Sequence, residues 1–206
     1  MAGNVAMIEL EKTVLVLLAA GKSERFGAGG SNLDLPFLSR PLGLHVAVTL
    51  EDMPFLRRVA IVDVCRIDYA AHHFDVLHDD DPARDMASSA RLGVRHARDN
   101  GAAAVMIALA AMPRVTAAHF YRMADAADGP DAVVASSNGR HPSMPVLFGS
   151  GRFDEVLRTT CDAQARDLIA AGKHVVTNEN ELIDVDTPAE MQRLRIIVGA
   201  AEVSAG

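Results

Sequence analysis

Short apolar runs alternate with amphipathic segments along the whole chain. Residues 14–20 form an unbroken apolar run, mostly Val and Leu, which ends at a glycine. A run of this length is typical of a strand buried on both faces. Residues 42–53, by contrast, repeat an apolar residue every fourth position, which predicts a helix with one buried face. The chain therefore opens with a buried strand, a long polar loop and a helix.

The same alternation continues to the end of the chain. Further strands are predicted over residues 59–64, 74–77, 104–109, 132–135, 144–148, 175–177 and 182–185, and further helices over 88–98, 116–127, 153–157 and 163–171. Thr187 and Glu190 form a capping box around Pro188, which predicts the start of a last helix. Alternating strands and helices predict an α/β fold with a mostly parallel sheet and helices on both faces. We expect one domain over residues 1–198 and a disordered tail over 199–206.

Composition narrows the classes of function. Half of the 206 residues are hydrophobic, which excludes a disordered chain. Aromatic residues make up 4%, without a Trp, and the formal net charge is -7. A nucleic-acid binder would need stacking aromatics or a basic surface, so we expect no nucleic-acid partner. An anionic ligand would have to be held by backbone N–H groups, a few cationic side chains or a metal.

The cysteines and the N-terminal segment indicate a location. Cys65 and Cys161 have no paired spacing, which excludes a disulfide framework and a Cys-rich zinc site. The first twelve residues, MAGNVAMIELEK, carry acids where a signal peptide carries bases. The apolar run at 14–20 is too short to span a bilayer. We expect a soluble, cytoplasmic protein without a membrane partner.

The loop after Gly21 is the most informative segment. Residues 21–36 are rich in Gly, Ser and Asn, and Lys22, Ser23 and Arg25 follow the turn at once. Such a loop can aim N–H groups and a guanidinium at a phosphate. It is not a Walker A loop or a dinucleotide fingerprint, because Phe26 and Asn32 stand where these motifs need glycine. From spacing alone, a phosphate loop and an ordinary surface loop both remain open.

Five segments together resemble one known family. They are LAAGKSERFG at 18–27, DMASSARLGV at 85–94, LAAMPRV at 109–115, PVLF at 145–148 and IDVDTPAE at 183–190. They are similar, in order and spacing, to the signature LAAGxSxRMG and the later motifs of the MobA-like NTP transferases. The similarity is greatest to the molybdenum-cofactor cytidylyltransferase (MocA-type) branch, and it covers nearly the whole chain.

The resemblance implies a three-layer α/β/α, Rossmann-like nucleotidyltransferase fold. Members transfer a nucleoside monophosphate from an NTP to a phosphorylated acceptor and release pyrophosphate; in this branch the substrates are CTP and molybdopterin. The implied nucleotide-binding residues are Leu18, Ala19, Ala20, Gly21, Ser23, Arg25, Ser88 and Ser89. Arg25 is the implied catalytic cation, and Asp184 and Asp186 are the implied Mg²⁺ ligands. Lys22 lies close by, at a position that varies in the family, and is a second candidate for a catalytic cation. Such a protein mostly aligns its two substrates and neutralises charge.

The sequence departs from the family where the chemistry is done. Asn32 stands where the family has a lysine that contacts the triphosphate, and Asp34 adds a negative charge nearby. Ala111 replaces the aspartate that binds Mg²⁺, and Met144 replaces a polar residue. Each lost cationic or metal contact can slow the reaction by about 10²–10³-fold. Two hypotheses follow: a nucleotidyltransferase with altered metal or substrate use, and a catalytically impaired nucleotide-binding or regulatory module. A third is an interaction protein that binds no nucleotide.

Several candidate residues also have simpler explanations. Asp184 and Asp186 alternate on a predicted strand and so point the same way, but they also fit a turn before a capped helix. Without the resemblance, helix capping is the better explanation for Ser88 and Ser89. Three histidines, at 72, 73 and 78, precede an acidic run at 79–81, which suggests either a mixed-ligand metal site or, more simply, a solvated acidic loop.

Overall fold

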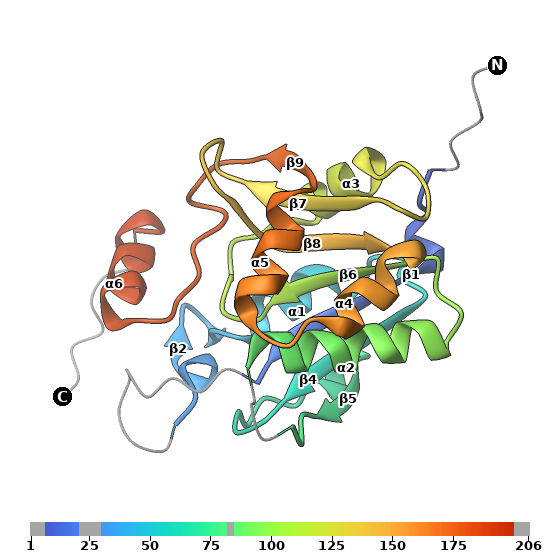
Figure 1. Cartoon of the computed structure of the whole chain (residues 1–206). Helices are drawn as coiled ribbons and strands as arrows, with labels where there is room; N and C mark the ends of the chain where they lie inside the picture. The colour runs from blue at the N-terminus through green and yellow to red at the C-terminus, as the bar shows by residue number, and fades with distance from the viewer. Residues whose placement is uncertain (1–6, 21–29, 82–84, 200–206) are drawn as a thin grey trace.

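A central strand organises the chain, which a computed structural model describes over residues 7–20, 30–81 and 85–199 (Figure 1). Every residue of β1 (Thr13–Ala19) is buried. β1 pairs in parallel with β4 (Arg57–Val62) on one side and β6 (Ala104–Leu109) on the other. Its apolar run is long because both faces of the sheet are covered. The strand predicted from the run at 14–20 is confirmed.

Seven strands form the main sheet of the described residues, in the order β5–β4–β1–β6–β8–β7–β9. The outer strands are β5 (Asp75–His78), β8 (Pro142–Gly149), β7 (Val133–Ser137) and β9 (Lys173–Val176). Among the described strands of this sheet, only β8 runs antiparallel to its neighbours, β6 and β7. The predicted mostly parallel sheet is therefore confirmed.

Helices cover both faces of this sheet, which gives the three layers expected (Figure 1). α2, α4 and α5 lie on one face, and α1 and α3 lie on the other. The α-helices are α1 (Leu44–Leu50), α2 (Met86–Asp99), α3 (Ala117–Ala126), α4 (Phe153–Arg158), α5 (Asp162–Ala170) and α6 (Pro188–Ile197), and short 3-10 helices span Leu10–Lys12, Asn32–Asp34, Ala70–His72 and Ser150–Arg152. In the part of the chain that the structure describes, no helix is long and apolar enough to cross a membrane.

A second, smaller hydrophobic cluster lies beside the main core. It joins the hairpin of β2 (Pro36–Phe37) and β3 (Arg40–Pro41) to α6 and to the segment that precedes α6. Its buried members are Phe37, Leu42, Ile183, Val185, Met191 and Leu194. Figure 1 shows α6 at the edge of the molecule, next to β2 and away from the layers of the main sheet. We call this unit the C-terminal cluster.

Two predictions for the C-terminal part had different outcomes. The strand predicted over 182–185 is wrong, because the main chain there pairs with no strand; the N–H of Val185 donates to the carbonyl oxygen of Ala111 instead. The predicted capping box is present. The Thr187 side chain accepts from the Glu190 N–H, and Glu190 in turn accepts from the N–H of Asp186. Of the predicted tail, Gly199 is described and residues 200–206 lie outside the described residues.

The close packing of α2 on β1 depends on Gly93. A Cβ at position 93 would lie 2.5 Å from Cγ1 of Val16, well inside van der Waals contact. We expect Gly93→Ala to lower the free energy of unfolding by about 1–2 kcal/mol, because overpacking outweighs the gain in helix propensity. Urea denaturation measures it. In a Val16→Ala background the same change should be neutral or stabilising; an equal loss in both backgrounds would contradict this origin.

Candidate functional site

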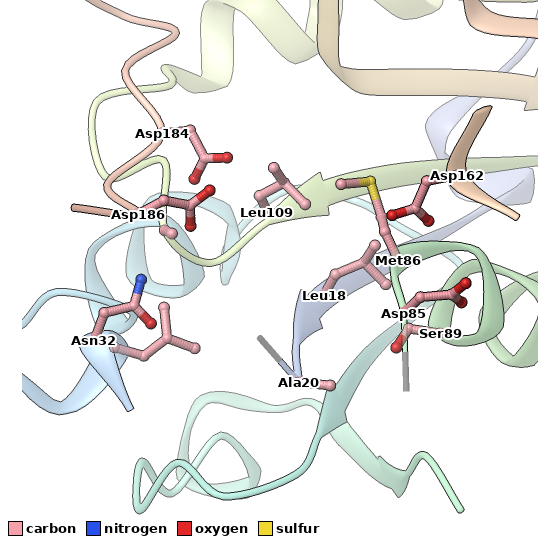
Figure 2. A pocket seen from close by; sticks show the side chains of 12 residues that line it. Leu18, Ala20, Asn32, Asp85, Met86, Ser89, Leu109, Asp162, Asp184 and Asp186 are labelled. Atoms are coloured by element: carbon pink, nitrogen blue, oxygen red, sulfur yellow. The ribbon is translucent and has the colours of Figure 1, made fainter. Parts of the chain in front are cut away.

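The described site is a pocket at the carboxyl ends of β1 and β6. After β1 the chain first adds β4 on one side of it and later adds β6 on the other, so the pocket lies where the strand order reverses. Ligands of open α/β sheets bind at this kind of switch point. The cavity measures about 260 Å³. It is lined by Leu18, Ala20, Asn32, Leu33, Asp85, Met86, Ser89, Leu109, Ala111, Asp162, Asp184 and Asp186 (Figure 2).

The end of β1 forms the floor of this pocket. Leu18 and Ala20 line it, whereas Ala19 is buried and is not among the lining residues. The carbonyl oxygen of Leu18 accepts a hydrogen bond from the N–H of Ala110, which joins the segment after β6 to the end of β1. Four candidates from the glycine loop, Gly21, Lys22, Ser23 and Arg25, lie outside the described residues. Ala20, directly before that segment, and Asn32, three residues after its end, both line the pocket.

Two carboxylates hold the N-terminus of α2 at one side of the pocket. Asp85 is the N-cap, and its side chain accepts from the N–H of Ser88 at 2.7 Å. Asp162, at the start of α5, accepts from the N–H of Ala87 at 3.0 Å. These bonds satisfy two of the free donors of a helix start, where negative charge is also stabilised. The interpretation of Ser88 and Ser89 as helix caps is therefore wrong.

The two serines bind a buried carboxylate instead. The hydroxyls of Ser88 and Ser89 each lie 2.7 Å from Oδ2 of Asp79. Burial alone would raise the pKa of Asp79, but the bonds from these serines, the N–H of Asp81 and the charge of Arg91 together lower it below its usual value. Asp79 is 5% exposed, so the description of this run as a solvated acidic loop does not hold for its first residue.

Asp184 and Asp186 lie on the opposite side of the pocket from Asp85 and Asp162 (Figure 2). Burial, followed by the negative charges of Asp186 and Glu190, raises the pKa of Asp184 to about 7. Oδ1 of Asp184 is buried and has no hydrogen-bond partner among the described residues. An ionised carboxylate in such surroundings is unfavourable unless a cation offsets its charge. Asp184 and Asp186 are thus brought together in the pocket, although not by the strand that the sequence predicted.

Two of the four residues that depart from the family pattern, Asn32 and Ala111, line this pocket. Ala111 is 8% exposed and presents a methyl group. Asn32 is 3% exposed, and its Nδ2 donates to the carbonyl oxygen of Val185 at 2.6 Å. The amide of Asn32 is therefore bound to the main chain between Asp184 and Asp186.

The described residues that line the pocket offer a cation carboxylate oxygens, among them those of Asp184 and Asp186. Over residues 7–20, 30–81 and 85–199, no group of three or more His, Cys, Asp or Glu side chains is arranged to hold a metal ion. The mixed-ligand site suggested by His72, His73 and His78 is therefore absent from the described residues. Asp184 and Asp186 are a pair, and two carboxylates suit Mg²⁺, which usually completes its shell with waters and phosphates.

Comparison with known proteins decides the family. Residues 15–176 match the MobA-like NTP transferase domain. The chain belongs to this family. It is 29% identical to the purine catabolism protein PucB of Bacillus subtilis, over 87% of this chain and 94% of PucB. A segment covering 28% of the chain is 41% identical to the 2-C-methyl-D-erythritol 4-phosphate cytidylyltransferase of Chlamydia caviae, of which it covers 26%.

Solved structures of other proteins share the fold. Rv0371c from Mycobacterium tuberculosis superposes with a TM-score of 0.71 at 21% identity, covering 88% of this chain and 96% of that one. Its complex with manganese gives 0.65 at 19% identity, over 88% and 97% of the two chains. The molybdopterin-guanine dinucleotide biosynthesis protein A of Archaeoglobus fulgidus gives 0.62 at 15% identity, over 91% and 100%. The Rossmann-like nucleotidyltransferase fold expected from the sequence is confirmed.

Proposed function

We propose that this MobA-like protein transfers a nucleoside monophosphate from an NTP, with CTP favoured, to a phosphorylated acceptor such as molybdopterin. An oxygen of the acceptor phosphate would attack the α-phosphorus of the NTP. The bond between that phosphorus and the bridging oxygen to the β-phosphate breaks, and pyrophosphate leaves with the electron pair. The observation that carries the proposal is the pocket at the switch point, bounded by the end of β1 and by Asp184 and Asp186. Membership of the family and similarity to a cytidylyltransferase support it.

The residues of the site divide the work in this proposal. Leu18 and Ala20, with the main chain of Ala19 between them, hold the base. The loop with Gly21, Lys22, Ser23 and Arg25 holds the triphosphate. Ser89 stays part of the pocket wall, while Ser88 helps to hold Asp79 beneath the start of α2. Fixed groups of this kind favour transfer by keeping acceptor and donor aligned.

The acidic pair fits a divalent cation. Asp184 and Asp186 supply carboxylate oxygens, the ligands that Mg²⁺ prefers, and the unpartnered Oδ1 of Asp184 would gain a cationic neighbour. When bound, Mg²⁺ or Mn²⁺ would neutralise charge on the phosphates during transfer. A manganese complex of a structural neighbour supports a metal in this fold. With Ala111 in place of an aspartate, the pair is a smaller ligand set than the family pattern provides.

A panel of nucleotides tests the proposal. CTP, GTP and ATP are titrated into the protein by calorimetry with and without Mg²⁺, and pyrophosphate release is then followed with molybdopterin as acceptor. We expect CTP to bind most tightly, Mg²⁺ to strengthen its binding, and pyrophosphate to appear only with the acceptor present. The absence of binding by all three nucleotides, both with and without Mg²⁺, would contradict the proposal.

A second function, a nucleotide-binding or regulatory module, is favoured by one observation. The amide of Asn32 is bound to Val185, and Ala111 offers a metal no ligand atom, so neither replaces the function of the family's residue. This hypothesis predicts nucleotide binding that is indifferent to Mg²⁺ and no pyrophosphate release. Asn32→Lys combined with Ala111→Asp discriminates between the two: gained activity would support a silenced site.

A further inference from the structure

Asn32 is held in a rigid setting. The hydroxyl of Ser31 accepts from the N–H of Leu33 and so caps the 3-10 helix Asn32–Asp34. Leu33 is 2% exposed, and its carbonyl oxygen accepts from the N–H of Gly43. The side chain of Asn32 therefore starts from a fixed backbone, and the bond that it makes to Val185 joins residues 153 positions apart.

The residue that Asn32 binds is restrained on three sides. The N–H of Val185 donates to Ala111 at 3.0 Å, and its carbonyl oxygen accepts from Asn32 at 2.6 Å. Its side chain is fully buried in the C-terminal cluster. With its N–H, its carbonyl and its side chain all engaged, Val185 has little freedom to rotate.

The two carboxylates of the pocket flank this restrained residue. Asp184 precedes Val185 and Asp186 follows it, and both line the cavity. The N–H of Asp186 is itself bound at 2.8 Å to Glu190 in the capping box of α6. The orientation of both carboxylates therefore depends on the main chain at Val185, to which Asn32 is hydrogen-bonded. Partners that orient a metal's ligands in this way govern affinity nearly as strongly as the ligands do.

We infer that Asn32 is a positioning residue for a divalent cation held by Asp184 and Asp186. Its amide holds the peptide between them so that both carboxylates face the pocket together. The role of that cation in nucleotidyl transfer rests on the proposed function. Position 32 would then serve the site without touching the triphosphate, through Val185. A lysine at 32 would add a positive charge beside the pocket and would lack the planar amide that reaches Val185.

Mn²⁺ binding to the nucleotide-free protein tests this inference without reference to turnover. The free-Mn²⁺ signal in electron paramagnetic resonance gives the dissociation constant. Asn32→Leu keeps a similar volume without the donor, and we expect it to weaken Mn²⁺ binding by about tenfold to a hundredfold. Asn138→Leu, the same change at an exposed residue that does not line the pocket, should change binding by less than about threefold. Asp184→Asn alone should weaken Mn²⁺ binding, and combined with Asn32→Leu it should cause little further loss of affinity.

A second variant and a second readout keep the test decisive. Asn32→Ala also removes the donor to the Val185 carbonyl and adds no charge to the pocket, so it should weaken Mn²⁺ binding as well. If a variant loses only the bond to Val185, amide hydrogen exchange should become faster at residues 183–187 and stay unchanged in β6. Faster exchange in β6 as well would indicate general unfolding. Wild-type Mn²⁺ affinity in both folded variants overturns the inference. Normal Mn²⁺ binding by the wild type, with no turnover for any NTP, would instead overturn the proposed function and leave the role of Asn32 standing.

Discussion

Asp184→Asn should stabilise the metal-free protein at pH 8 and lower its metal-dependent turnover by about 10²–10³-fold. The wild-type carboxyl has its pKa raised to about 7 by burial and by the charges of Asp186 and Glu190. A carboxyl with a raised pKa stabilises the fold below the unfolded value, near pH 4, and that stability is lost as the pH rises through 7. The variant carries no charge there and so escapes the loss.

The size of this effect follows from the two pKa values. The pKa of Asp184 rises from its ordinary value of 3.8 to about 7. The difference in free energy of unfolding between variant and wild type should therefore change by on the order of 4 kcal/mol from pH 4 to pH 8. Urea denaturation at both pH values, in the presence of EDTA, measures it. Pyrophosphate release with CTP and Mg²⁺ measures the loss of turnover. Asp125→Asn, an exposed change on α3, is the control and should affect neither.

The combination of outcomes is informative. A gain in stability together with a loss of turnover is what a carboxylate retained for its chemistry would give, since the charge is unfavourable for folding alone. Unchanged turnover with the expected gain in stability would remove Asp184 from the proposed metal site. If the difference in free energy of unfolding does not vary with pH, the raised pKa of Asp184 is contradicted.

Acid should destabilise the protein through His119, on the far side of the sheet. His119 is fully buried in α3, and Ser136 in β7 lies 2.8 Å from its Nε2. The Ser136 hydroxyl donates to the carbonyl oxygen of Pro145, so Nε2 must carry the imidazole proton. Arg122 donates to Nδ1 at 3.0 Å. Burial first, and then the charge of Arg122, lower the pKa of His119 to about 4 against a weaker opposing effect of Glu181.

The sign follows from linkage. Between pH 6.5 and 4, His119 is protonated in the unfolded chain but stays neutral in the folded protein. The free energy of unfolding therefore falls as the pH falls, by about 3 kcal/mol in all. His119→Gln can keep a donor toward Ser136 and an acceptor toward Arg122 without titrating. We expect the variant to be less stable than the wild type at pH 8 and the difference to shrink by that amount at pH 4.

Urea denaturation at pH 8, 6.5, 5 and 4 checks this expectation, because other groups titrate in both proteins and cancel in the difference. His141→Gln, at an exposed position, is the matched control and should track the wild type. A His119→Gln difference that stays constant across the series would show that His119 does not couple folding to protons.

The central strands of the main sheet were predictable from the sequence because they are buried on both faces. An unbroken apolar run such as that of β1 has few alternatives, and Thr116 correctly marked the start of α3. The segment before α6 was not predictable in the same way. Its alternating pattern resembles a strand, but Ile183 and Val185 alternate because they enter the C-terminal cluster, while the main chain bonds to Ala111 and Asn32.

The candidate site was predictable where motif and geometry agree, and not where a bond spans the chain. The sequence indicated that Asp184 and Asp186 face one way, and both line the pocket. It did not indicate that Asp79 would collect two serine hydroxyls, or that Asp162 would reach α2 from 75 residues away. Asp is among the favoured N-cap residues, and Asp85 lies shortly before the predicted helix, so this preference could have identified it.

The separation of the two hydrophobic clusters bears on how the protein would fail when heated. Ile183 and Val185, which hold the site carboxylates in place, belong to the smaller one, and the seven-stranded sheet does not depend on it for its own burial. Small units with few apolar contacts open first. A warmed sample would then lose the arrangement of Asp184 and Asp186 while its circular dichroism still looked native, so shelf life should be judged by assay and not by melting temperature.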